Sequence, residues 1–385
     1  MTIERIHLHS FRNYEEAVFC PSDAVNLIYG NNGSGKTNIL EAIHYCALGR
    51  SHRTGYDREV IRKNERVGVC SLSVRSNHGM NQIKITLTPF GIKKKNVEIN
   101  GKCISRMSDL MGKLRCVMFS PEDILIIKEG PSLRRRYLDM FISQINTAYF
   151  IELQKYNRLI NQRNALLKQI RKNEKEQTIL LEIMEEQIVQ SQAVLIPIRM
   201  RYIEKIRENV RFLYQKISQK SNEILDIQYC GPLIQYERIS DDLRKKYESS
   251  REHDIINGVT SVGIHRDDIE INLNNHLIRT YGSQGQIRTA ALCMKMSQIS
   301  IMESEVGEKP VLLLDDVLSE LDYLRRKFLL ESISGVQTFI TCTDLEDYDK
   351  KVAFHPVLVK NQDGIAEIEN SIELDNKTVE DPLFL

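Results

Sequence analysis

Several features are missing from this sequence, and each absence excludes a class of protein. The eight cysteines are never closer than thirteen residues, so no Cys-x-x-Cys pair predicts a zinc knuckle or a thioredoxin-like centre. No run approaches the roughly 18 apolar residues of a membrane span, and the start lacks the basic and apolar segments of a signal peptide. We therefore expect a cytoplasmic protein with reduced, mostly buried thiols.

The sequence also has no large excess of positive or negative charge. Lysine and arginine number 53, aspartate and glutamate 52, and the formal net charge is +1. Such a chain is no bulk polycation, so any binding to nucleic acid must use a local patch. Its 385 residues, 42% of them hydrophobic and 27% charged, have an ordinary globular composition with room for two or three domains.

Strand patterns are present near both ends of the chain. Residues 3–8 alternate apolar and polar side chains, and residues 25–29 form a short apolar run. Further strand candidates are residues 82–88, residues 96–99 before the favoured turn Asn100-Gly101, a hairpin at 269–278, and residues 311–314, 336–341 and 357–359. We expect the acidic end, residues 373–385, to be frayed.

The middle of the chain has no glycine between Gly130 and Gly231, which predicts mostly helix there, with strands returning only after Gly258. Apolar residues recur every three or four positions between 153 and 170 and again between 195 and 217. The polar residues 171–176 predict a turn between two antiparallel helices. From 151 to 220, basic residues outnumber acidic ones by 14 to 8.

A glycine-rich loop carries the clearest chemistry. Residues 30–37 match G-x-x-x-x-G-K-[ST] between an apolar strand and a candidate helix. Glycines let backbone N–H groups surround phosphate oxygens, and the helix N-terminus adds positive potential. Lys36 would place its charge on the outer phosphates, and Thr37 would offer its hydroxyl to Mg²⁺. We predict that ATP is bound by Gly30, Asn31, Asn32, Gly33, Ser34, Gly35, Lys36 and Thr37.

Two further segments fit the same chemistry. The apolar residues 311–314 end in Asp315, a candidate Mg²⁺ ligand, and Asp316, a candidate base for the attacking water. Upstream, Ser283-Gln284-Gly285-Gln286 leads into a helix-like stretch and is a candidate anion site. Alone, the first pattern also fits a buried strand that meets a loop, and the second also fits a solvated helix cap.

Together these motifs resemble an ABC-type ATPase head of the SMC-like branch, and within that branch the RecF family. The resemblance is carried by Phe11-Arg12-Asn13-Tyr14, 119–123, Gly130-Pro131 with 134–139, His265-Arg266-Asp267-Asp268, 283–289 and 314–322. It implies an α/β fold in which a P-loop mixed sheet with flanking helices carries an inserted, mainly helical second lobe. The expected divisions are 1–128 (ATPase lobe, N-terminal part), 129–300 (helical lobe with the signature) and 301–385 (ATPase lobe, C-terminal part).

The resemblance also implies a dimer in which the signature of one subunit closes over ATP held by the other. The nucleotide-binding residues it adds are Arg12, Ser283, Gly285, Gln286 and Asp322. Members of the family act in bacterial recombinational repair, replication restart and the SOS response, bind DNA, and with RecR and RecO help to load RecA at single-strand gaps. A hydrolysing ATPase of this kind would use Lys36, Asp315 and Asp316.

The sequence departs from transporter-type heads in two places. Asp316 stands where a glutamate is usual, one methylene longer, so we expect weak, slow hydrolysis suited to a switch. The late loop Thr341-Cys342-Thr343 lacks the expected histidine, and Thr343 is our candidate for the γ-phosphate sensor. Two alternatives stay open: a subunit that energises a membrane transporter, and an SMC-like clamp, which would need far longer coiled-coil arms.

DNA contacts are predicted only as alternatives. The basic candidates are 93–95, 134–136, the series Arg53, Arg58, Arg62, Lys63 and Arg66, and the helical arm, each of which could equally be a solvated face. No base-reading motif is present, so binding would be directed at the DNA backbone, single-stranded or gapped. The sequence suggests no role for His265 and Arg266.

Overall fold

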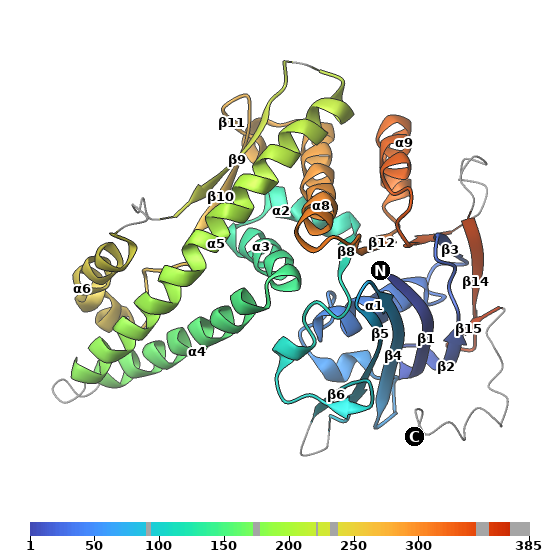
Figure 1. The fold of residues 1–385 in the computed structure, drawn as a ribbon, viewed down its shortest axis with the longest axis horizontal. Helices are drawn as coiled ribbons and strands as arrows, with labels where there is room; N and C mark the ends of the chain where they lie inside the picture. Colours follow the sequence, from blue (N-terminus) through green and yellow to red (C-terminus); the bar gives the residue numbers. More distant parts are fainter. Residues whose placement is uncertain (90–93, 172–177, 221, 232–237, 344–353, 370–385) are drawn as a thin grey trace. The chain divides into compact units, whose positions relative to one another are not determined.

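The computed structural model describes residues 1–89, 94–171, 178–220, 222–231, 238–343 and 354–369. The chain divides into two compact units (Figure 1). Unit 1 comprises Met1–Asp123 and Gln298–Leu385, and unit 2 comprises Ile124–Ser297. The helical part of the chain is thus an insertion between two segments that fold together.

The first sheet of unit 1 has the strand order β15-β14-β3-β13-β12-β8. All neighbouring strands are parallel except β14 and β15. The inner strands are buried and almost wholly apolar, as expected of a parallel sheet that is covered on both faces. The strands are β3 (Val25–Tyr29), β8 (Cys116–Phe119), β12 (Val311–Asp315), β13 (Thr338–Cys342), β14 (Phe354–Gln362) and β15 (Ile365–Ile368).

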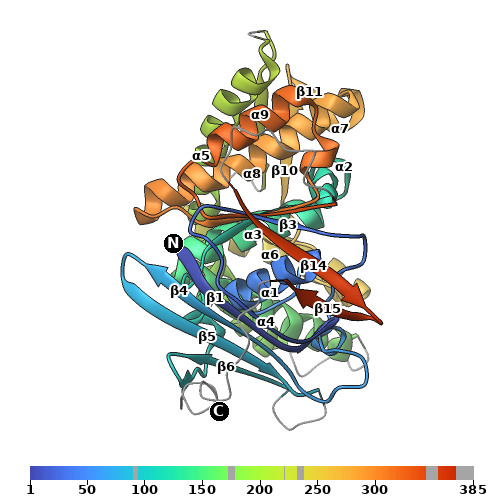
Figure 2. The same ribbon diagram turned by 90° about the vertical axis from the view of Figure 1, so that its right-hand side faces the viewer.

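The second sheet of unit 1 is antiparallel, in the order β2-β1-β4-β5-β6-β7. Its buried positions alternate with half-buried ones, which is the period-2 pattern of residues 3–8. Helix α1 (Lys36–Leu48), buried from Ile39 to Leu48, contacts strands of both sheets (Figure 2). The strands are β1 (Thr2–Phe11), β2 (Tyr14–Phe19), β4 (Gly68–Ser76), β5 (Gly79–Leu87), β6 (Lys95–Ile99) and β7 (Lys102–Cys103).

Unit 2 is mainly helical. Helices α4 (Thr147–Ile170) and α5 (Thr178–Ser218) are antiparallel, because Glu152 bonds Ser191 while Arg163, further along α4, bonds Glu185, earlier in α5. This confirms the predicted helix pair; residues 172–176 of the predicted turn lie outside the described residues, as does the acidic end. The other helices are α2 (Leu125–Lys128), α3 (Pro131–Ile145), α6 (Ile239–Asn257), α7 (Ile278–Tyr281) and α8 (Gln284–Val306), which runs on into unit 1, where α9 (Tyr323–Ser332) follows.

One strand contradicts the expectation that strands return only after Gly258. β9 (Leu225–Cys230) lies inside the glycine-free stretch and pairs with β10 (Asp268–Leu273), which forms the predicted hairpin with β11 (His276–Leu277). Residues 225–230 alternate Leu, Asp, Ile, Gln, Tyr and Cys, a strand period that the absence of glycine does not reveal.

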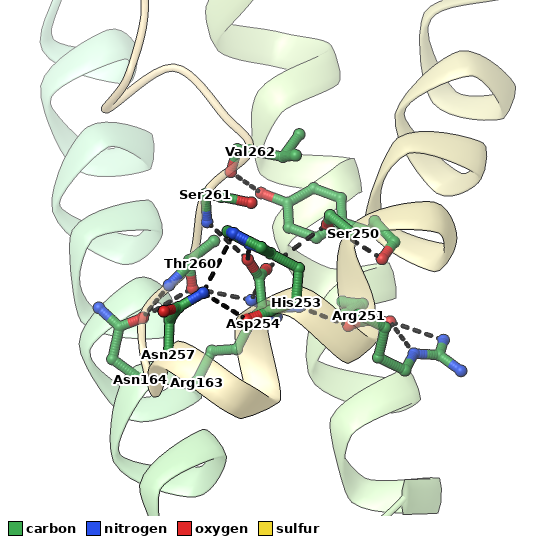
Figure 3. A network of polar contacts seen from close by, with 12 residues as sticks. Arg163, Asn164, Ser250, Arg251, His253, Asp254, Asn257, Thr260, Ser261 and Val262 are labelled. Atoms are coloured by element: carbon green, nitrogen blue, oxygen red, sulfur yellow. Dashed lines mark hydrogen bonds and ion pairs between the residues drawn. The ribbon is translucent and has the colours of Figure 1, made fainter.

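A buried charged network holds α4, α5 and α6 together (Figure 3). Arg163 and Asp254 have fully buried side chains and are joined at 2.8 Å, and Arg163 also bonds Glu185 at 2.7 Å. Arg251 reaches the second oxygen of Glu185. Such charges are tolerated in a helical core only when each is paired, so the network selects one packing of the three helices. No helix in the described part of the chain is both long enough and apolar enough to cross a membrane.

Candidate functional site

The phosphate loop lies between the end of β3 and the start of α1. Gly30, Gly33 and Gly35 have φ of 144°, 78° and 118°, a region that side chains rarely adopt. A Cβ on Gly30 would stand 2.2 Å from the carbonyl oxygen of Val359 in β14. Residues 36 and 37 begin α1, where backbone N–H groups have no acceptor within the helix. The loop therefore leads into the N-terminus of α1, where a phosphate group is predicted to bind.

Asn13, in the turn between β1 and β2, and Tyr14, the first residue of β2, form hydrogen bonds with this loop. The Asn13 amide donates to the carbonyl of Ser34 at 3.0 Å, and the Tyr14 hydroxyl donates to that of Gly35 at 3.1 Å. The side-chain amide of Asn38, in the first turn of α1, donates to the side-chain oxygen Oδ1 of Asn13 at 2.7 Å. The backbone carbonyls of Ser34 and Gly35 are thus bonded to other parts of the protein. The sequence showed these two residues only as part of a resemblance.

Lys36 points back along the loop. Its Nζ donates to the carbonyls of Gly30 and Asn31 at 2.6 and 2.9 Å. Partial burial lowers the pKa of Lys36, although Cys342, Asp316 and Asp315 act in the opposite direction. The ammonium is therefore under the electrostatic influence of Asp315, the last residue of β12, and of Asp316, which follows it. Within the loop, the N–H of Ser34 donates to the carbonyl of Asn31, and the Ser34 side chain is buried.

Asp315 and Thr37 stand together, as a Mg²⁺ site requires. The register of the parallel strands sets Asp315 beside Thr341, and Thr341 beside Ile28 at the end of β3. Asp315 Oδ1 accepts hydrogen bonds from Thr37 at 2.7 Å and from Thr341 at 2.9 Å. One carboxylate and one hydroxyl beside a phosphate loop suit a cation that keeps several waters. The residues present therefore fit Mg²⁺, although in the described part of the chain no three acidic, histidine or cysteine side chains cluster around a metal position.

Asp316 follows the last residue of β12, and its backbone no longer has strand conformation. Its φ is +51°, which aspartate tolerates better than most residues, and its N–H donates to Thr341 at 2.9 Å. Its side chain is exposed, and the Ser319 hydroxyl donates to the backbone carbonyl of Asp316 at 2.7 Å, with the carboxylate oxygen further away at 3.2 Å. The carboxylate thus lies at the end of the strand, next to the Asp315 that bonds Thr37.

Arg12 is bonded to protein groups in this structure, and its predicted contact with the nucleotide stays a prediction. Its guanidinium makes a bidentate contact with the fully buried carboxylate of Glu41 in α1, at 2.8 and 2.6 Å, and donates to the Glu59 carbonyl at 2.6 Å. Burial opposes the ionisation of Glu41, but hydrogen bonds from Arg12 and Ser51 outweigh it and lower its pKa. Arg12 therefore joins the β1–β2 turn to α1. Glu41 is a residue that sequence reasoning missed.

Replacing Arg12 by alanine is expected to lower the free energy of unfolding by about 2 kcal/mol at pH 7, because a buried carboxylate loses its main partner. Ser51 and Arg53 still contact Glu41, so the loss stays below that of an isolated pair. The lowered pKa of Glu41 contributes stability above the ordinary glutamate value of roughly 4.3, and this contribution is lost as the pH falls below it. Denaturant unfolding should therefore show a difference that shrinks toward pH 4, whereas Arg66→Ala, at an exposed position, should change little. An unchanged stability at pH 7 contradicts the prediction.

The remaining predicted residues of unit 1 lie at strand and helix ends. Thr343 is exposed and follows Cys342, the β13 residue paired with Tyr29 just before the loop. Asp322 caps α9 by accepting a hydrogen bond from the N–H of Arg325 at 3.0 Å. Both positions remain predictions as nucleotide contacts.

The signature residues lie in unit 2, at the start of α8. The Ser283 Oγ accepts from the N–H of Gln286 at 3.3 Å, and the Gln286 side chain accepts from the N–H of Ser283 at 2.8 Å. This reciprocal cap leaves Ser283 exposed at a helix N-terminus. Gln286 also donates to Glu223, and the carbonyl of Gly285 accepts from Thr289. Thus the predicted helix start with serine and glycine is confirmed, whereas its role toward ATP stays a prediction.

Of the basic candidates for DNA contact, the structure buries one and pairs several others with protein groups. Arg134 is buried and makes a bidentate contact with Asp268, because α3 packs its first turn against β10. Lys95 is bonded to the carbonyl of Gly49 and paired with Asp57. Arg62 pairs with Glu15 and Glu65, and Arg53 donates to Asn38. Arg58, Lys63, Lys94, Arg66 and Arg136 are exposed, and Lys93 lies outside the described residues.

His265 has a structural position in unit 2. One ring nitrogen contacts the Tyr156 hydroxyl at 2.6 Å and the other the carbonyl of Thr260 at 3.2 Å. Burial lowers the pKa of His265 to about 4, helped by the nearby charges of Arg266 and Arg135. The imidazole is therefore neutral at physiological pH and links the turn at 265 to α4.

Comparison with known proteins agrees with this geometry. The family model described as RecF/RecN/SMC N terminal domain matches residues 2–365. The chain is 41% identical to the DNA replication and repair protein RecF of Acetivibrio thermocellus over 356 residues, which is 91% of this chain and 95% of that protein. It is 38% identical to RecF of Clostridium acetobutylicum over 372 residues, 96% of this chain and 98% of that protein.

Solved structures of other proteins have a similar fold. A structure of the recombination mediator protein RecF with ATP, in the RecFOR pathway, aligns with a TM-score of 0.87 at 38% identity, covering 95% of this chain and 97% of that one. An Smc head domain from Pyrococcus furiosus aligns at 0.54 with 18% identity, covering 95% of each chain, which concerns the fold alone. The predicted fold, an ABC-type ATPase head with an inserted helical lobe, is confirmed.

Proposed function

Because the chain belongs to the RecF family of DNA replication and repair proteins, we propose that it is an ATP-gated DNA-binding dimer of recombinational repair. The observation that carries the proposal is the hydrogen bond between Thr37, which follows Lys36 in the phosphate loop, and Asp315, 278 residues further along the chain. The family assignment supports this function over the alternative of a transporter subunit, and the length of the helical arm supports it over a long SMC-like clamp.

ATP is the proposed ligand of the phosphate loop, with its outer phosphates beside Lys36. Thr37 and Asp315 would hold Mg²⁺, which neutralises phosphate charge when it is bound. Asp316, which follows Asp315 at the end of β12, would accept the proton of the attacking water. Its short, exposed side chain supports slow hydrolysis, as expected of a timer that resets the protein.

The exposed Ser283 at the N-terminus of α8 supports an interface role for the signature. In the proposed dimer, Ser283, Gly285 and Gln286 of one copy close on ATP held by the loop of the other. Thr343 and Asp322 remain candidates for contacts at the same interface. With DNA bound, this dimer would act with RecR and RecO to help load RecA at single-strand gaps in the bacterial cytoplasm.

Light scattering tests this function directly. The mass should rise from the 44.6 kDa of one chain to that of a dimer when ATP and Mg²⁺ are added, and a short duplex should bind more tightly to that dimer. ADP with Mg²⁺ serves as the control and should leave a monomer. A single chain under saturating ATP, with or without DNA, would overturn the proposal.

A further inference from the structure

Two arginines of unit 2 differ from several others in the groups that they contact. Several ordered arginines of this unit contact carboxylates, namely Arg134, Arg163, Arg199, Arg207, Arg211, Arg244 and Arg251. Arg135 and Arg266 instead contact backbone carbonyls. Arg135 donates to the carbonyl of Asp267 at 2.7 Å, and Arg266 donates to that of Thr260 at 3.2 and 2.9 Å.

This arrangement orients both guanidinium groups without neutralising them. A carbonyl accepts a hydrogen bond but carries no net charge, whereas a carboxylate cancels the cation. Of the five N–H donors of a guanidinium, Arg266 uses two and Arg135 one, so both keep donors for a ligand. Within the described residues, neither arginine has a carboxylate at ion-pair distance. Arg266 is exposed and Arg135 half-buried.

The surroundings leave positive charge in excess. Asp268 forms an ion pair with Arg134, and Asp139 forms one with Arg199. The carboxyl of Asp267 accepts from the Tyr229 hydroxyl, and burial raises its pKa although Arg199, Arg135 and Lys246 oppose this. His265 is neutral, as described above. Burial and Arg199 lower the pKa of Arg135 against the opposing effect of three carboxylates, but Asp268 and Asp139 already pair with other arginines, and burial raises the pKa of the third, Asp267.

The backbone around these arginines is rigid. Gly263 has φ of 127°, and a Cβ there would stand 2.5 Å from the Tyr156 hydroxyl. Thr260, whose carbonyl holds Arg266, is itself bonded through its N–H to Asn164 and through its hydroxyl to Arg163 (Figure 3). The guanidinium of Arg266 is therefore positioned before any ligand arrives, which reduces the entropy lost on binding.

We propose that Arg135, in the first turns of α3, and Arg266, on the turn 263–268, form a binding site for a phosphodiester group of the DNA backbone. The site rests on the proposed DNA binding and names where that binding occurs. Oriented guanidinium groups match the oxygens of a phosphate. Because the chain has a net charge of only +1, its attraction for DNA must come from uncompensated cations such as these.

Titration of DNA binding against salt concentration tests this site. The full chain with ATP and Mg²⁺ is mixed with a fluorescein-labelled 30-base-pair duplex, or the same duplex carrying a gap, at several potassium chloride concentrations. In the double variant Arg135→Gln and Arg266→Gln, the slope of log K against log salt should fall by about 0.9 for each phosphate that the protein no longer neutralises, with affinity at least ~10-fold weaker. Arg135→Lys with Arg266→Lys should keep most of the slope, because the charges remain.

A matched control removes two charges that carboxylates already compensate. Arg207→Gln with Arg244→Gln lies in the same unit and should leave slope and affinity nearly unchanged. Equal losses in both double variants would mean that only net charge matters and would overturn the inference. So would a wild-type slope in Arg135→Gln with Arg266→Gln, and in that case the proposed function stands because wild type still binds. If wild-type protein with ATP binds neither DNA, the proposed function itself fails.

Discussion

Replacing Lys36 by arginine is expected to lower the rate of ATP hydrolysis at least ~100-fold while nucleotide is still held weakly. The lysine ammonium sits between the carbonyls of Gly30 and Asn31, at 2.6 and 2.9 Å. A planar guanidinium keeps the charge but cannot occupy this narrow position or approach the outer phosphates in the same way. Without hydrolysis, the protein should remain on DNA once ATP has bound.

Phosphate release under steady-state conditions measures this effect. The wild-type rate should lie below about 10 s⁻¹, the median for enzymes, because Asp316 is short and exposed. Lys63→Arg, at an exposed position of the same unit, is the matched control and should hydrolyse ATP as wild type does. Hydrolysis and release from DNA at normal rates in Lys36→Arg would leave the phosphate loop without a catalytic role.

Replacing Ser283 by aspartate is expected to abolish the ATP-dependent dimer. Aspartate caps a helix about as well as serine, so α8 should still begin at Gln284, and a negative charge at a helix N-terminus stabilises it further. In the proposed interface, however, this carboxylate would face the triphosphate of the other copy. Repulsion between like charges costs several kcal/mol, which corresponds to a dimer at least ~100-fold weaker.

Threonine at position 283 is the matched control, because it keeps both the cap and the hydroxyl. Light scattering with ATP and Mg²⁺ should show a dimer for Ser283→Thr and a single chain for Ser283→Asp, with similar thermal unfolding of both. If Ser283→Asp formed the dimer as readily as wild type, the signature would not lie on the nucleotide, and the account of the interface would fail.

The elements around the phosphate loop were predictable because their patterns are local. An apolar strand, a glycine-rich loop and a helix start follow one another between residues 25 and 48, and each depends mainly on its neighbours in sequence. The reciprocal cap at Ser283 is local in the same sense. β9 also carried a local signal, its alternation of apolar and polar residues, but the absence of glycine suggested helix instead.

Basic residues show the opposite case. Arg134, Arg135 and Arg136 are equivalent in sequence, yet Arg134 is buried on Asp268, Arg135 donates to a carbonyl, and Arg136 is exposed. Which of these applies depends on the turn 263–268, more than a hundred residues away. Arg12 likewise became a structural partner of Glu41 because α1 packs against β1.

Residue order therefore decided where the glycine-rich loop lies and where most of the strands and helices form, since these follow from neighbouring side chains and backbone geometry. The packed fold alone decided which charges are cancelled and which remain for a ligand. Burial and pairing arise between segments remote in the chain, and the cost of an unpaired buried charge makes that arrangement specific.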